Sequence, residues 1–133
     1  MRYLLDTDIC VEVMRGRGSG IFERMRNCPA KSVGISSITL AELEYGATKS
    51  QRPQNNRIAL AKFCAPLEIH AFDADAAAFY GSVRTELERL GQTIGPLDTL
   101  IAAHGLALGA VLVTNNEREF RRVRGLEVAN WAR

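Results

Sequence analysis

The sequence predicts an α/β fold, a doubly wound, mainly parallel sheet with helices on both faces. Two observations lead to this expectation. Short apolar runs recur along the whole chain, and longer segments with three- and four-residue apolar spacing separate them. Strands that alternate with helices form parallel sheets whose crossover helices cover both faces. With 133 residues, the chain is expected to form one domain, 1–133, with a core of its own.

Five apolar segments are expected to be strands. The first begins at Tyr3 and stops at two carboxylates, Asp6 and Asp8. The run 110–114 is the most strand-like stretch, because branched apolar side chains dominate it. The other strands are expected at 33–36, 67–72 and 126–128.

Helices are expected between these strands. The longest starts after Asp73 and ends at Gly91, a residue type that caps helices in the left-handed conformation. Its apolar stripe comprises Ala76, Phe79, Tyr80, Val83, Leu87 and Leu90. Pro96 opens a second long helix, which runs to Gly109. Shorter helices are expected at 9–14, 21–27, 57–65, 117–123 and from Thr39 onwards, with a glycine-rich hinge at 15–20 and a polar loop at 50–56.

Composition excludes several classes of protein. A hydrophobic content of 47% and a charged content of 24% are typical of globular proteins. No apolar run approaches the roughly 20 residues of a membrane span, and no secretory signal precedes the first strand, so a cytoplasmic protein is expected. Cys10, Cys28 and Cys64 have neither the number nor the spacing of a disulfide framework or a zinc site. The net charge of +2 does not itself indicate a nucleic-acid binder, although it permits a polyanionic substrate.

Carboxylates follow the first predicted strand directly. In open parallel sheets, ligands bind beyond the carboxyl ends of the strands, where the strand order reverses. Asp8 stands just before a helical segment, so we expect it to cap that helix. Asp6 still belongs to the buried strand pattern, where an unpaired carboxylate is costly to desolvate. We therefore expect Asp6 to have a partner such as a metal ion.

Further polar residues stand where strands end or helices begin. They are Glu42, Asp98, Asn116 and Glu119. Each has a local explanation as well, because Thr39 and Glu42 form a capping-box pattern, Asp98 complements a helix dipole, and Asn115 and Asn116 are typical turn residues.

Together these acids point to a cation. Two carboxylates about 4 Å apart repel by roughly 4 kcal/mol at an effective dielectric near 20. That is a large share of the stability of a small domain. Hard oxygen ligands are those that Mg²⁺ and Mn²⁺ prefer, and such a cation assists phosphodiester displacement.

Four segments resemble motifs of the PIN-domain ribonucleases and, more narrowly, of the VapC toxins of bacterial toxin–antitoxin pairs. They are LLDTD at 4–8, ISSITLAEL at 35–43, GPLDTLIA at 95–102 and VTNNEREFRRVRGL at 113–126, in the family's order. The resemblance implies a PIN-like doubly wound sheet and a Mg²⁺-dependent endoribonuclease in which Mn²⁺ can substitute. It also implies a homodimer and a cognate VapB-type antitoxin, with DNA reached only through that antitoxin and with no membrane.

Carried over by position, the resemblance makes Asp6 and Asp98 direct metal ligands. Glu42 becomes a further ligand or the residue that orients the attacking water. The chain departs from the family at the fourth acid, because Asn116 stands where many members have Asp. Either Glu119, one helical turn further on, supplies that charge instead, or a second metal site is weak or absent. Thr114 becomes a residue that positions water or phosphate. The most similar subgroup cuts initiator tRNA in its anticodon loop, and family members leave a 5′-phosphate and a 3′-hydroxyl.

Two other functions compete with this hypothesis. Asp6 and Asp8 also match the D-x-D signature of phosphatases that form an aspartyl-phosphate, although no lysine follows Asp98 as that family requires. The third alternative is a non-catalytic module that binds RNA or an antitoxin. His104 is expected at the surface or half-buried, His70 is expected to point outward, and Trp131 is expected to anchor the last strand.

Overall fold

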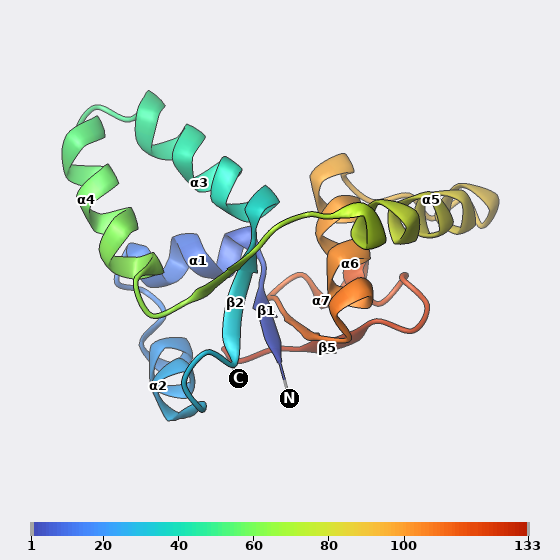
Figure 1. The fold of residues 1–133 in the computed structure, drawn as a ribbon, viewed down its shortest axis with the longest axis horizontal. Coiled ribbons are helices and arrows are strands. Elements are labelled where there is room, and N and C mark those ends of the chain that lie inside the picture. The colour runs from blue at the N-terminus through green and yellow to red at the C-terminus, as the bar shows by residue number, and fades with distance from the viewer. Residues whose placement is uncertain (1, 133) are drawn as a thin grey trace.

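The protein is described here by a computed structural model, which describes residues 2–132. Five strands form one sheet in the order β3-β2-β1-β4-β5, and each neighbouring pair is parallel. The central strand β1 lies between β2 and β4, so the strand order reverses there (Figure 1). The predicted doubly wound sheet is therefore confirmed, and it is parallel throughout. The strands are β1 (Tyr3–Leu5), β2 (Val33–Ser36), β3 (Glu68–His70), β4 (Val111–Val113) and β5 (Glu127–Ala129).

Helices cover both faces of this sheet. In Figure 1 the first four lie on one side of the strands and the last three lie on the other side. They are α1 (Thr7–Met14), α2 (Ser19–Asn27), α3 (Ser37–Lys49), α4 (Pro53–Cys64), α5 (Ala74–Arg89), α6 (Pro96–Leu108) and α7 (Glu117–Phe120). No helix of the described residues is long and apolar enough to cross a membrane.

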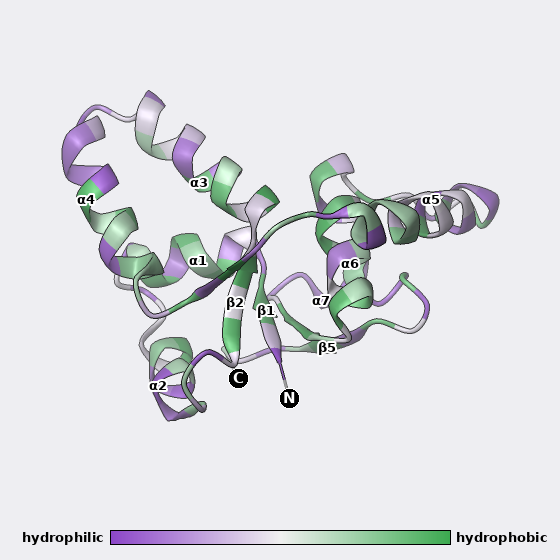
Figure 2. Cartoon of the chain, in the orientation of Figure 1, coloured by the Kyte–Doolittle hydropathy of each residue, from purple (hydrophilic) through white to green (hydrophobic). Residues whose placement is uncertain are grey.

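Each face of the sheet has its own hydrophobic core. Leu4 and Leu5 are neighbours in β1, and both are completely buried, but they belong to different cores. Side chains along a strand alternate between faces, so a central strand must be apolar at every position. Figure 2 shows the hydrophobic strands between helices whose outer faces are hydrophilic. The apolar run before Asp6 therefore anchors both cores at once.

Five helices differ from their predicted bounds. α1 begins at Thr7 and α2 at Ser19, each two residues earlier than predicted. α3 begins at Ser37, two residues earlier than predicted, because the Ser36 hydroxyl accepts the Ile38 N–H at 3.0 Å and caps the helix. α4 begins at Pro53, so half of the expected polar loop is helical. α7 is a single turn that ends at Phe120.

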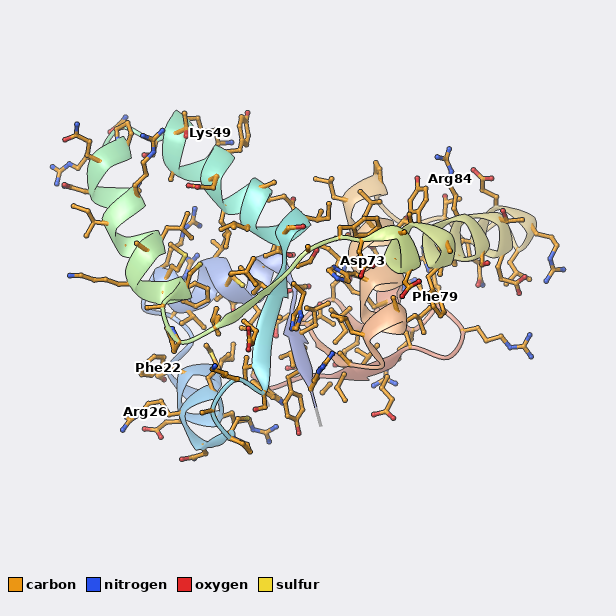
Figure 3. All side chains as sticks on the ribbon, viewed as in Figure 1. Phe22, Arg26, Lys49, Asp73, Phe79 and Arg84 are labelled. Atoms are coloured by element: carbon orange, nitrogen blue, oxygen red, sulfur yellow. The ribbon has the colours of Figure 1, made fainter. Side chains whose placement is uncertain are left out.

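The longest helix, α5, buries a narrower stripe than its sequence predicts. Ala76, Val83 and Leu87 are buried, but Leu90 is 49% exposed and Phe79 is 42% exposed. Figure 3 labels Phe79 on α5. α5 packs mainly on α6, so only the side chains that face this one neighbour are covered. The predicted left-handed cap at Gly91 is confirmed, with φ of 64°, and Gly109, which ends α6, has the same conformation with φ of 63°.

The aromatic residues correct two predictions and confirm one. His104 is only 1% exposed, not at the surface. His70 is half-buried and its ring meets the His104 ring edge-on, whereas its neighbour Ile69 is 40% exposed, so the two sides of β3 are the reverse of those predicted. Trp131 packs on the Tyr3 ring at 4.9 Å and anchors the last strand as expected. The three cysteines are free.

Gly34 should be irreplaceable in the middle of β2. A Cβ atom there would stand 2.5 Å from the Glu68 carbonyl oxygen and 2.9 Å from the His70 ring, so β2 and β3 would have to move apart. We expect Gly34→Ala to lower the free energy of unfolding by about 2 kcal/mol or more in urea titrations. The control is Gly46→Ala in α3, where no atom lies within 4 Å of the added methyl group. It should gain up to about 1 kcal/mol, and equal effects of the two changes would contradict the close packing.

Candidate active site

Asp6 is held at the carboxyl ends of the two central strands. Its backbone N–H donates to the Val113 carbonyl at 3.0 Å, and its side chain is 3% exposed. One carboxylate oxygen accepts the Ile9 N–H at 3.0 Å, and the other accepts the Thr114 hydroxyl. Asp6, not Asp8, is therefore the N-cap of α1, and the predicted cap at Asp8 is wrong. Asp8 lies instead in the first turn and is exposed.

The hydrogen bonds of Asp6 do not compensate for its burial. Desolvation raises the pKa of Asp6 to about 6, against the opposing effect of the Thr114 and Ile9 hydrogen bonds. The negative charges of Asp8 and Asp98 contribute in the same direction as burial. The side chain is therefore desolvated, and it feels other carboxylates.

Asp98 is the second acid whose pKa is raised. It lies in the first turn of α6 and is half-buried. Burial raises its pKa to about 6, and the charges of Glu119, Asp8 and Glu42 add to the effect. Asp98 thus interacts with the other three predicted site acids, Asp6, Glu42 and Glu119, which come from three other segments. Asp8 joins them, although its sequence context suggested only a cap.

Glu42 is positioned by a residue that sequence reasoning missed. Glu42 lies in the second turn of α3, and the Thr7 hydroxyl donates to its Oε1 at 2.6 Å. The Thr7 hydroxyl also lies 3.2 Å from that of the buried Thr39. The predicted capping box of Thr39 and Glu42 is wrong, because Ser36 caps α3. The only sequence signal for Thr7 was its place between Asp6 and Asp8.

Asn116 and Glu119 are joined directly. The Asn116 side-chain amide donates to Glu119 Oε2 at 3.0 Å, and its backbone N–H donates to the Thr114 hydroxyl oxygen at 2.9 Å. Thr114 therefore connects the turn after β4 to Asp6. Asn115 lies on the outside, where its amide donates to Glu12 at 3.1 Å.

We call the group formed by Asp6, Glu42, Asp98 and Glu119 the acidic pocket. Its donor set fits a hard divalent cation. All its potential ligands are carboxylate, hydroxyl or amide oxygens. In the described part of the chain, the ion pairs lie within single helices and none involves Asp6, Glu42 or Asp98. No three acidic, histidine or cysteine side chains among residues 2–132 already form a metal cluster. Asp6, Glu42 and Asp98 thus have no ion-pair partner in the described part of the chain, and the acids do not form a closed metal-binding cluster.

Comparison with known proteins first shows which protein family the chain matches. The sequence profile of the PIN domain matches residues 3–126. Solved structures of the same fold include the VapBC complex of Salmonella typhimurium bound to DNA, with a TM-score of 0.93, 40% identity and 98% of each chain covered. Another is VapBC2 of Rickettsia felis bound to a promoter DNA fragment, with a TM-score of 0.91, 41% identity and 98% and 99% coverage.

Curated relatives narrow the class. The chain is 40% identical to the tRNA(fMet)-specific endonuclease VapC of Shigella flexneri over 132 residues, 99% of each chain. It is 42% identical to ribonuclease VapC2 of Rickettsia felis, with 98% of each chain covered. The chain therefore belongs to the PIN-domain family and, within it, to the VapC ribonucleases. This membership confirms the resemblance and counts against the phosphatase alternative.

Removing one acid should stabilise the protein when no metal is added. Asp98 has a higher pKa in the folded chain than the ordinary value of 3.8, so the folded state loses stability as the pH rises from about 4 to about 6. In EDTA, Asp98→Asn should be more stable than the unaltered chain at pH 8 by about 1 kcal/mol, less than the roughly 3 kcal/mol expected of a fully buried group, because solvent screens the charge of this half-buried side chain. The two proteins should converge near pH 4. Urea titrations at both pH values measure this, and a variant less stable at pH 8 would contradict it.

Proposed function

We propose that this chain is the toxin of a VapBC-type toxin–antitoxin pair, a Mg²⁺-dependent endoribonuclease that hydrolyses RNA phosphodiester bonds. The observation that carries the proposal is the pair Asp6 and Asp98, whose pKa values are both raised to about 6 in a chain of the VapC family. Perturbed carboxyl groups that share one pocket are typical of catalytic sites.

Asp6, Asp98 and Glu42 are the proposed metal ligands, and Glu119 is proposed to add charge to the same pocket. Each oxygen of Asp6 already accepts one hydrogen bond, but a carboxylate oxygen has two lone pairs, so coordination remains open to it. When bound, Mg²⁺ supplies positive charge that offsets the acids and the charge building up on the phosphate. Mn²⁺ is expected to substitute.

Neutral side chains of the pocket do the positioning. Thr114 and the Ile9 N–H fix both oxygens of Asp6. Thr7 directs Glu42 for its proposed role as a metal ligand, and Asn116 directs Glu119. Glu119 thereby takes the place of the acid that many relatives have at position 116. Attack on phosphorus is proposed to leave a 5′-phosphate and a 3′-hydroxyl.

Initiator tRNA is the proposed substrate. The relative of Shigella flexneri is named as specific for tRNA(fMet), and it is 40% identical to this chain along nearly its whole length. An anticodon loop suits such an enzyme because its unstacked bases can be splayed out and reached. Since this substrate is cytoplasmic, we propose that the chain acts in the cytoplasm.

A cognate VapB-type antitoxin is the proposed partner. The similar structures from Salmonella typhimurium and Rickettsia felis are of VapBC complexes bound to DNA. We propose a homodimer that reaches DNA only through its antitoxin. An antitoxin arginine could pair with the acids and offset the same repulsion as a metal. We propose that such an arginine inhibits RNA cleavage by taking the place of the metal, which requires no change of fold.

Replacing either central acid should abolish cleavage. Asp6→Asn and Asp98→Asn keep the size of the side chain but remove one ligand charge each, so RNA cleavage in Mg²⁺ should fall at least about a hundredfold. The control is Asp75→Asn, an exposed change in the first turn of α5 that should leave the rate unaltered. End-mapping of cellular RNA after brief expression would show whether initiator tRNA is cut. Cleavage retained in either site variant would overturn the proposal.

Thr7→Val tests the positioning of Glu42. The change keeps the shape of the side chain but removes the hydroxyl that donates to Glu42 Oε1, so the Mg²⁺ concentration needed for half-maximal cleavage should rise about tenfold. Thr85→Val is the matched control, because the Thr85 hydroxyl only contacts its own helix through the Gly81 carbonyl. Identical Mg²⁺ dependence in both variants would show that Thr7 does not act through Glu42.

A further inference from the structure

His104 makes two polar contacts in the interior of the protein. The side chain is 1% exposed. Its Nδ1 lies 2.8 Å from the Ser36 hydroxyl oxygen, and the ring also hydrogen-bonds the backbone of Ala71. The ring of Phe72 meets it edge-on at 5.4 Å. A histidine inside a helix as apolar as α6 therefore joins three separate segments.

The contacts of the ring favour one tautomer. The Ala71 backbone raises the pKa of His104, as a carbonyl oxygen that accepts a ring N–H does, and because Nδ1 already faces Ser36 we assign this N–H to Nε2. Nδ1 is then free to accept the Ser36 hydroxyl proton. The Ser36 oxygen in turn accepts the Ile38 N–H at 3.0 Å. Each group in this chain of hydrogen bonds has one role, and a neutral imidazole fits all of them.

The charges around the ring act on it in opposite directions. Desolvation lowers the pKa of His104, and the neighbouring His70 lowers it further, whereas Asp73 at the start of α5 raises it. Figure 3 shows Asp73 on the same side of the sheet as α6. The His70 ring packs over Gly34, where an added Cβ would stand only 2.9 Å from it. The His104 ring therefore has the edge-on His70 ring as a neighbour on the side of β3.

The two helices that His104 connects are those that carry proposed metal ligands. Ser36 ends β2 and caps α3, and Glu42 lies in the second turn of that helix. Asp98 lies six residues before His104 in α6, which is about 9 Å along the axis. α3 and α6 are neighbours in the fold. The hydrogen bond between His104 and Ser36 therefore holds the start of α3 against α6.

We infer that His104, as a neutral Nε2–H imidazole, is a positioning residue that locks the start of α3 against α6 and so fixes Glu42 relative to Asp98. This inference rests on the proposed function, because it gives the two acids a common ligand. His104 does not touch the acids themselves. It acts through Ser36 and through the rigidity of the two helices.

The test compares three variants at a temperature where all are folded, as judged by circular dichroism. His104→Leu removes both polar contacts, and His104→Asn offers an amide oxygen to Ser36 in place of Nδ1. Val83→Ala is the control, because it weakens the packing of α5 on α6 but leaves the polar link intact. Two readouts are taken, namely the Mg²⁺ concentration for half-maximal RNA cleavage and the rise in Tm that Mg²⁺ causes.

We expect His104→Leu to need about tenfold more Mg²⁺ in both readouts, His104→Asn to recover part of this loss, and Val83→Ala to lower Tm without altering the Mg²⁺ dependence. An unchanged Mg²⁺ dependence in His104→Leu would overturn the inference. If the unaltered chain shows a Mg²⁺-dependent Tm but cuts no RNA, the proposed function fails while the inference is decided by Tm alone. If it shows no response to Mg²⁺, both fail.

A second measurement does not depend on the variants. Nitrogen chemical shifts of His104 in the unaltered protein report the tautomer directly. We expect a protonated Nε2 and an unprotonated Nδ1 between pH 6 and 8. The opposite tautomer, or a charged ring at neutral pH, would overturn the inference even if His104→Leu does not fold.

Discussion

The burial of one carboxylate at the meeting point of β1 and β4 is the constraint on which the rest of the structure depends. Asp6 can occupy this place because two donors lie ready for it, the Ile9 N–H at the start of α1 and the Thr114 hydroxyl at the end of β4. Both are neutral, so they orient the carboxylate without removing its charge. The remaining charge is left to whatever binds beyond the strand ends.

The same rule holds for the other acids of the pocket. Thr7 holds Glu42 and Asn116 holds Glu119, and neither brings a positive charge. A lysine or arginine in their place would neutralise the pocket and compete with a cation from outside. Hydroxyl and amide donors fix the direction of each side chain and keep the pocket anionic. The neutral donors Thr7, Thr114 and Asn116 are therefore as specific a feature of the site as the acids themselves.

The sequence predicts the parts that depend on local pattern. The strand before Asp6, the Pro96 start and the left-handed Gly91 are all set by residues within one turn, and they are confirmed. It fails where the outcome depends on packing between distant segments. Thr7 lies 35 residues from Glu42, and His104 lies 68 residues from Ser36, so no local pattern could reveal either contact. The cap at Asp6 was missed because two acids compete for one helix start, and only the strand end decides between them.

The raised pKa values couple occupancy of the pocket to protons. Asp6 and Asp98 each have a pKa of about 6 in the folded chain without a cation. A cation binds the ionised forms, so below about pH 6 its binding must release protons, and its apparent affinity falls as the pH is lowered. An arginine from a protein partner meets the same condition, because it too needs ionised carboxylates. The proposed metal and a partner arginine would therefore require the same protonation state of the site. The ionised acids repel one another at neutral pH when nothing is bound, so binding of either a cation or an arginine would lower the free energy of the site.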